Sequence, residues 1–83
     1  MTRQKSRDKE AERLFWAELG LRIAIARDTK GFTQTTLSKR IGISRTSVAN
    51  IEAGRQRVDV FGLRVIAQVI GCGMLTLLPK VRT

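Results

Sequence analysis

Four side chains between residues 45 and 50 have the types and spacing needed to read nucleic-acid bases. Arg45 can make a bidentate pair with guanine O6 and N7, and Asn50 can do the same with adenine N6 and N7. Thr46 can contact a thymine methyl group or donate to a phosphate. In a helix these positions fall on or near one face together with Ala49, and that face has no large apolar residue. The pattern indicates a surface that contacts bases.

Donors placed around this segment are suited to the phosphate backbone. Thr33, Gln34 and Ser44 stand where two helices are expected to begin, and helix N-termini attract anions. Instead of contacting a base, Arg45 could be a solvated arginine or a phosphate anchor. Lys39 and Arg40 could be surface charges that only keep the protein soluble. The residues expected to contact phosphates are Thr33, Gln34, Arg40, Ser44, Ser47, Arg55 and Arg57.

The first helix needed to position these residues precedes a glycine. Thr33 is suited to be its N-cap, and Leu37 and Ile41, four residues apart, share its buried face. Gly42 then ends the helix where a residue with positive φ is needed. The chain can therefore turn within the next two residues.

A second helix follows this turn and carries the candidate base readers. Ser44 offers an N-cap for a helix over residues 45–53, and Gly54 ends it. Val48 and Ile51 point to the side opposite the base-reading face. A helix of this kind fits the major groove of B-DNA, and a preceding helix can hold it there.

A long helix is predicted before this pair. Ser6 is suited to cap it, with Asp8 and Glu10 in its first turn, and it should run to about Asp28, before Gly31. The predicted core face consists of Phe15, Trp16, Leu19, Ile23 and Ala26.

The same helix has a second apolar stripe on nearly the opposite side, formed by Leu14, Leu21 and Ile25 with Ala17 beside them. Such a helix in a small domain needs a second burial partner. Either the N-terminal extension or the C-terminal segment folds over the stripe, or another subunit contacts it. The residues expected at an interface with a second copy or another protein are Leu14, Leu21, Ile25, Met74, Leu75, Leu77 and Leu78.

The remaining segment predicts one further full helix and a short ambiguous element. Asp59 is suited to cap a helix over residues 60–70 that Gly71 ends. Residues 74–78 fit either a short helix stopped by Pro79, which we prefer, or a strand paired with its twin in a dimer. We expect an all-α, compact five-helix bundle in one domain over residues 7–79, with a disordered basic tail at 1–6 and a loose tail at 80–83.

Charge and composition narrow the classes of function. Sixteen Lys and Arg against seven Asp and Glu give a formal charge of +9, and residues 29–83, with nine bases and two acids, carry +7 of it. Such a balance favours DNA, RNA or an anionic membrane surface as partner. One cysteine and no histidine predict a reduced intracellular protein with no metal site and no cofactor. With no signal peptide or spanning segment apparent, we expect a cytoplasmic protein that is neither a membrane protein nor an enzyme.

Three stretches together resemble a known family. The sequences LGLRIAIAR, GFTQTTLSKRIGISRTSVANIEAGR and LRVIAQVIG are similar to the helix-turn-helix family of phage Cro and cI repressors and xenobiotic-response-element regulators. The resemblance implies a lambda-repressor-like fold in a bacterial or phage-encoded protein that binds double-stranded DNA. It also implies that Gln34 binds a phosphate and braces the second helix, and that Arg27 and Glu52 form a structural ion pair.

The sequence departs from the family in the long helix predicted before the helix pair. Leu21, Ala24 and Ile25 stand where the family usually has charged surface residues, and Ala26 replaces a larger aliphatic residue. The departures reinforce the expectation of an added contact on this helix. Residues 1–18 lie outside the resemblance.

These observations predict a sequence-specific DNA-binding transcriptional regulator. We expect a homodimeric repressor that binds a palindromic operator through the major groove. Two alternatives use the same fold. One is the antitoxin of a toxin-antitoxin pair, which would hold a toxin on the apolar stripe of the long N-terminal helix or on the C-terminal segment, and the other is a restriction-modification controller protein. From a different class, the domain could be a protein-interaction module without DNA binding.

Overall fold

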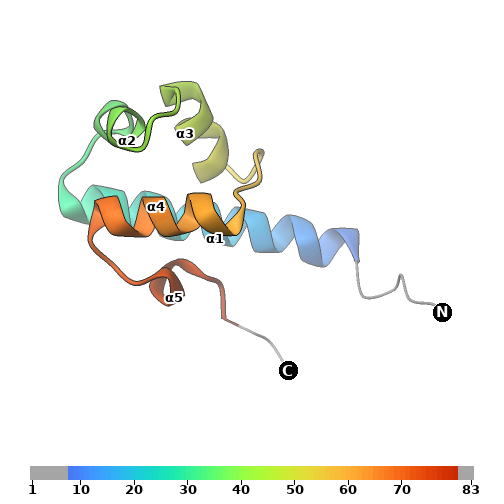
Figure 1. Ribbon diagram of the computed structural model, residues 1–83. Helices are drawn as coiled ribbons and strands as arrows, with labels where there is room; N and C mark the ends of the chain where they lie inside the picture. Colours follow the sequence, from blue (N-terminus) through green and yellow to red (C-terminus); the bar gives the residue numbers. More distant parts are fainter. Residues whose placement is uncertain (1–7, 81–83) are drawn as a thin grey trace.

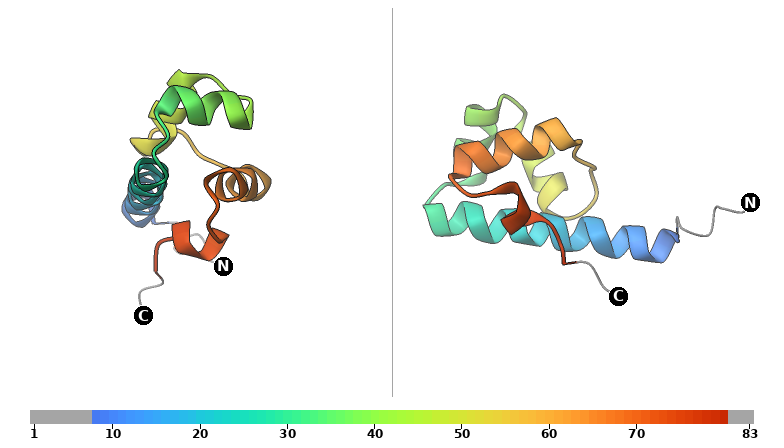
Figure 2. Two further views of the ribbon diagram at one scale, coloured as in Figure 1. Left: turned by 90° about the vertical axis from the view of Figure 1, so that its left-hand side faces the viewer. Right: turned by 60° about the horizontal axis from the view of Figure 1, so that its bottom comes forward.

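The computed structural model describes residues 8–80, and these form five helices and no strand. In chain order the helices are α1 (Lys9–Lys30), α2 (Gln34–Ile41), α3 (Arg45–Glu52), α4 (Val60–Ile70) and α5 (Met74–Leu77) (Figure 1). The pair α2 and α3 lies on one side of α1 and α4, and α5 lies on the other side (Figures 1 and 2). The predicted all-α, five-helix architecture is confirmed.

Helix α1 begins slightly later than predicted. Ser6, the expected N-cap, lies outside the described residues, and the cap is Asp8, whose side chain accepts the N–H of Glu10 at 2.9 Å. Asp8 was predicted to lie inside the first turn, but it is the N-cap, so the helix begins two residues later than expected. At the other end α1 continues to Lys30, two residues past the predicted last residue, Asp28. The backbone N–H of Gly31 caps it by donating to the carbonyls of Arg27 and Asp28.

Three predicted N-caps are present. The side chains of Thr33, Ser44 and Asp59 accept the backbone N–H three residues further on, at 3.0, 3.0 and 2.7 Å. Each such cap stabilises a helix by about 1 kcal/mol. These short-range bonds fix where α2, α3 and α4 begin.

The core lies where the inner faces of the helices meet. Trp16 and Ala26 are half-buried against the core, as predicted. The prediction that Phe15 belongs to the core face is wrong. Its side chain is 37% exposed and meets the Trp16 ring edge-on at 5.1 Å, because α1 at this point extends beyond the other helices. The buried apolar residues are Leu19, Ile23, Leu37, Val48, Ile51, Leu63, Ile66, Ala67, Ile70 and Leu77.

The C-terminal segment is helical, as preferred, and the alternative of a strand over residues 74–78 is wrong. Leu77 is fully buried and therefore belongs to the core of the single chain, which corrects its assignment to an interface. Met74 and Leu78 are half-buried against the same core, whereas Leu75 is 84% exposed. The single turn of α5 explains the difference, since only one side of it faces α1 and α4.

Candidate nucleic-acid interface

The turn between α2 and α3 is tight because a glycine begins it. Gly42 has φ 82°, and its N–H and that of Ile43 both donate to the carbonyl of Ser38, at 2.9 and 3.1 Å. Ser44 then caps α3, and Val48 and Ile51 of α3 are buried in the core. The opposite side of α3 is thereby turned outward.

This outward side holds the predicted base readers. Arg45 and Thr46 are exposed, and Ala49 and Asn50 are half-buried. Arg45 Nη1 donates to Gln34 Oε1 at 3.2 Å, and Asn50 Oδ1 accepts from Arg55 Nε at 3.3 Å. The fold thus brings two candidate base readers into contact with two candidate phosphate binders.

A carboxylate at the end of α3 ties three helices together. Glu52 Oε2 lies 2.6 Å from Arg27 Nε, and Glu52 Oε1 accepts from Arg27 Nη2 at 3.1 Å and from Gln34 Nε2 at 2.9 Å. Arg27 also donates to the carbonyl of Phe32 at 2.7 Å. The hydrogen bond to Glu52 raises the pKa of Arg27, so this arginine remains a cation. Gln34 is consequently held between Glu52 and Arg45, in the bracing position that the family resemblance implied.

Other candidate phosphate binders have partners of their own within the protein. The Arg40 guanidinium stacks over the Phe32 ring at 4.9 Å from its centroid. Ser47 donates its backbone N–H to Ser44, and the two hydroxyl groups lie 3.2 Å apart. Arg55 remains exposed apart from its bond to Asn50. These cations and hydroxyl groups are accessible, but the structure does not gather all of them on the face of α3.

A contact that was not predicted from the sequence joins the loop after α3 to the N-terminal half of α1. Arg57 Nη2 lies 2.6 Å from Glu12 Oε2, and Trp16 Nε1 donates to the same oxygen at 3.4 Å. The Arg57 side chain is still 68% exposed. Opposite charge was the only available signal, because the two residues are far apart in sequence and Glu12 lies outside the resemblance.

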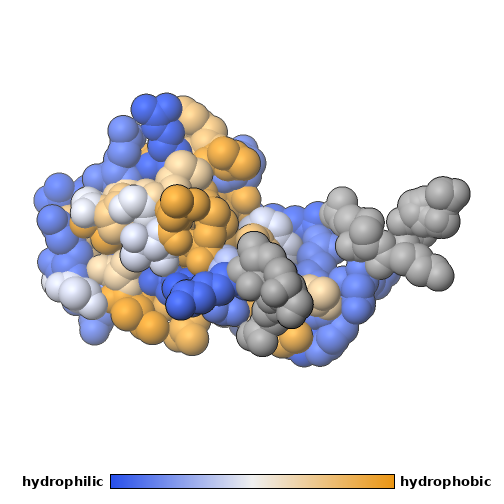
Figure 3. Space-filling view, turned by 90° about the horizontal axis from the view of Figure 1, so that it is seen from below, coloured by the Kyte–Doolittle hydropathy of each residue, from blue (hydrophilic) through white to orange (hydrophobic). Residues whose placement is uncertain are grey.

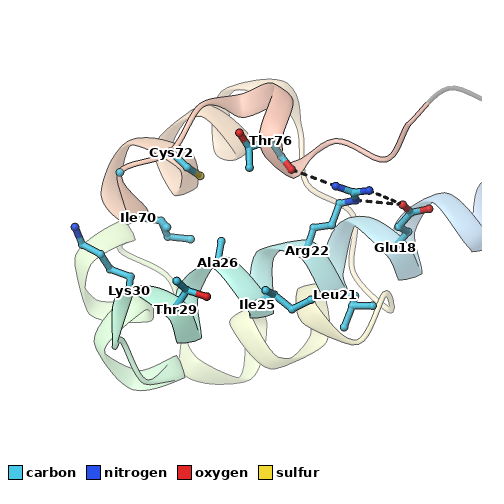
Figure 4. Close-up of a pocket in the computed structure, with 11 residues that line it drawn as sticks. Glu18, Leu21, Arg22, Ile25, Ala26, Thr29, Lys30, Ile70, Cys72 and Thr76 are labelled. Atoms are coloured by element: carbon cyan, nitrogen blue, oxygen red, sulfur yellow. Dashed lines mark hydrogen bonds and ion pairs between the residues drawn. The ribbon is translucent and has the colours of Figure 1, made fainter.

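The second apolar stripe of α1 borders a groove on the side away from α2 and α3. Leu21 and Ile25 are each 57% exposed, and the groove that they line with Ala26, Ile70 and Cys72 has a volume of about 760 Å³ (Figure 4). Apolar residues gather on this underside of the molecule (Figure 3). The small side chain at position 26 leaves the groove open. Leu14, 53% exposed, borders a neighbouring hollow.

The described part of the chain contains no set of three or more His, Cys, Asp or Glu side chains placed to hold a metal ion. None of the helices within residues 8–80 is long and apolar enough to cross a membrane.

Known proteins resemble this arrangement of helices. Residues 23–77 match the family model described as helix-turn-helix. The chain belongs to this helix-turn-helix family. One similar solved structure is the restriction-modification controller protein C.AhdI from Aeromonas hydrophila, with a TM-score of 0.72 and 26% identity over 75% of this chain and 94% of that one. Another is the hypothetical transcription factor NHTF from Neisseria, with a TM-score of 0.75 and 26% identity over 83% and 79%.

A comparison with curated protein sequences found no significant match. The helix-turn-helix match covers both α2 and α3, and the two similar structures are described as a controller protein and a hypothetical transcription factor. The protein is a DNA-binding transcriptional regulator.

Proposed function

We propose that this helix-turn-helix regulator recognises a specific duplex sequence by placing α3 in the major groove, and that it represses transcription by occupying promoter DNA. The exposed face of α3 carries the proposal, since Arg45 is held there by Gln34, which is fixed in turn by Glu52. A guanidinium held in this way loses less freedom when it pairs with a guanine. In this role the protein acts on cytoplasmic DNA and catalyses no reaction.

The proposal includes a homodimer on a palindromic site. One short helix reads only a few base pairs, and a dimer places two recognition helices about 34 Å apart in successive major grooves on one side of the DNA. The dimer surface must therefore leave both α3 helices facing the same side of the duplex.

This requirement disfavours the underside groove at Leu21 and Ile25 as the dimer surface. A two-fold axis through the underside would put the two α2–α3 pairs at opposite ends of the dimer. A second exposed apolar pair, Ile43 of the α2–α3 turn and Phe61 of α4, lines a common hollow, and Phe61 is 71% exposed. Its neighbour in the chain, Val60, is 76% exposed. We propose that the second copy binds there, because both recognition helices then stay on one side.

The decisive experiment is selection of bound duplexes from a random DNA pool, followed by measurement of protein mass in solution with and without the selected site. We expect a sequence with two-fold symmetry and a complex of two chains. A recovered pool with no common sequence would contradict specific recognition. Loss of binding to every duplex at low salt would favour the protein-interaction module, because phosphate attraction alone gives detectable binding there.

A restriction-modification controller is the second candidate. Its support is the similarity to C.AhdI, which extends over 94% of that chain. A selected site that lies upstream of adjoining restriction and methyltransferase genes would favour this role. The antitoxin alternative makes a different prediction, namely that a protein encoded beside this one co-purifies with it and that Leu21→Glu releases that protein.

A further inference from the structure

Two cations of the N-terminal half of α1, Lys9 and Arg13, lie outside the helix-turn-helix match, on a stretch that also carries Glu10, Glu12 and Glu18. The family model begins at residue 23, whereas α1 begins at Lys9 and extends past the other helices (Figures 1 and 2). A hollow of about 330 Å³ lies between this half of α1 and the loop after α3. Its lining includes the cations Lys9, Arg13, Arg55 and Arg57 and one carboxylate, Glu12.

Close packing holds the loop after α3 on α1. A Cβ added at Gly54 would stand only 2.8 Å from Ala17 Cα, so the loop backbone already touches the helix. The Arg57–Glu12 ion pair, at 2.6 Å, fastens the next part of the loop. The backbone of this half of α1 is therefore held in a fixed position relative to the end of α3.

The hollow also continues directly from the base-reading face. Asn50 is bonded to Arg55, and Arg55 lines the hollow together with Arg13 of α1. Arg13 is paired with Glu10 at 2.7 Å, but both side chains are 64% exposed, so this pair costs little to open. With Glu10 included, four cations face two carboxylates, which leaves a net positive charge beside the recognition helix.

We propose that the N-terminal half of α1 is a second DNA-binding element, in which Lys9 and Arg13 bind duplex phosphates that flank the base pairs read by α3. The inference rests on the proposed function, because it requires α3 to be in the major groove. Lys9 lies about 12 Å along the helix axis from Ala17, at 1.5 Å per residue. At about 3.4 Å of duplex axis for each phosphate of one strand, a helix lying parallel to that axis would pass three or four phosphates over this length. The element thus lengthens the contact with the backbone without reading sequence.

The test compares the full chain with the double variant Lys9→Ala/Arg13→Ala on the selected operator and on a scrambled duplex, over a series of salt concentrations. Losing two phosphate contacts should flatten the slope of log K against log salt by about 1.8 per chain. The ratio of the binding constant of the unaltered protein to that of the variant should therefore fall by about 12-fold per chain between 50 and 200 mM salt. The loss should be equal for both duplexes.

The matched control is Arg64→Ala/Lys80→Ala, which removes the same charge from exposed positions on α4 and after α5, both outside the hollow. Ethylation interference should show that the α1 variant alone loses phosphate contacts on the flanks of the site. Equal salt slopes for all three proteins would overturn this inference while leaving the proposed function standing, as would equal flattening by both variants. If the unaltered protein binds no duplex at low salt, both the proposed function and this inference are wrong.

Discussion

Gly20 of α1 lies directly against the carbonyl oxygen of Ile51 at the end of α3. A Cβ added at Gly20 would stand 2.3 Å from that oxygen and 2.5 Å from the carbonyl oxygen of Glu52. No side chain fits between the two helices at this point. This close contact therefore helps to set how α3 is inclined on the body of the molecule.

Gly20→Ala should lower the free energy of unfolding by about 2 kcal/mol, because the added methyl group forces α1 and α3 apart. The higher helix propensity of alanine offsets only part of this loss. Urea denaturation gives the value. Gly73→Ala is the control, since Gly73 has φ −80° and its nearest neighbour would be Thr76 Oγ1 at 4.0 Å. Equal stability of the two variants would contradict the packing described.

Glu52→Gln should destabilise the protein by about 3 kcal/mol, because it leaves the Arg27 cation without its charged partner in a mostly buried site. The side chains of Arg27 and Glu52 are only 15% and 7% exposed. Glu18→Gln removes a half-exposed partner of Arg22 and should change the free energy of unfolding by no more than about 1 kcal/mol. Thermal unfolding of both variants would show whether burial separates them.

Arg45→Ala should relax the preference at one base pair of each half-site, with a loss of about 1–3 kcal/mol of discrimination. Competition between the selected operator and its single-base variants measures this loss. Arg57→Ala should behave differently, by weakening all duplexes alike and flattening the salt dependence. An unchanged base preference in the first variant would exclude a base contact for Arg45.

Phe61→Glu should shift the protein from dimer to monomer, because it places a charge in the apolar surface beside the α2–α3 turn. Sedimentation equilibrium measures the shift. Leu21→Glu alters a residue that is also exposed, on the underside, and should leave the dimer intact. The reverse result would move the dimer contact to the underside stripe, as first predicted from the sequence.

Cys72 should react slowly with thiol reagents at pH 8. Burial raises the pKa of its thiol, so a smaller fraction is thiolate at this pH than in a free cysteine. The rate of alkylation should therefore keep rising at pH values where a free cysteine is already saturated. In urea the rate should return to that of an unfolded peptide, and equal rates in both conditions would contradict the burial.

Local rules predicted most of the fold from sequence. Thr33, Ser44 and Asp59 each bond to a backbone N–H only three residues away, so position in the chain was sufficient to identify them. The Arg27–Glu52 pair was accessible only through the family resemblance. Sequence periodicity placed Phe15 on the core face, but the end of the core depends on where other helices stop.

Long-range arrangement explains the other differences. Leu77 is as apolar as Leu75, and only the docking of α5 decides that one is buried and the other exposed. The contact between Glu12 and Arg57 depends on the path of the loop after α3, which no periodic pattern encodes.

Helix α1 is a single uninterrupted helix, and it carries in turn the cations beside the hollow, the glycine beneath α3 and the arginine bound to Glu52. The number of residues between these groups therefore sets both their separation along the axis of α1 and their rotation about it. One residue inserted between Trp16 and Gly20 would advance Lys9 and Arg13 by about 1.5 Å and turn them by about 100°. Such an insertion would therefore move both proposed phosphate-binding cations away from their place beside the end of α3.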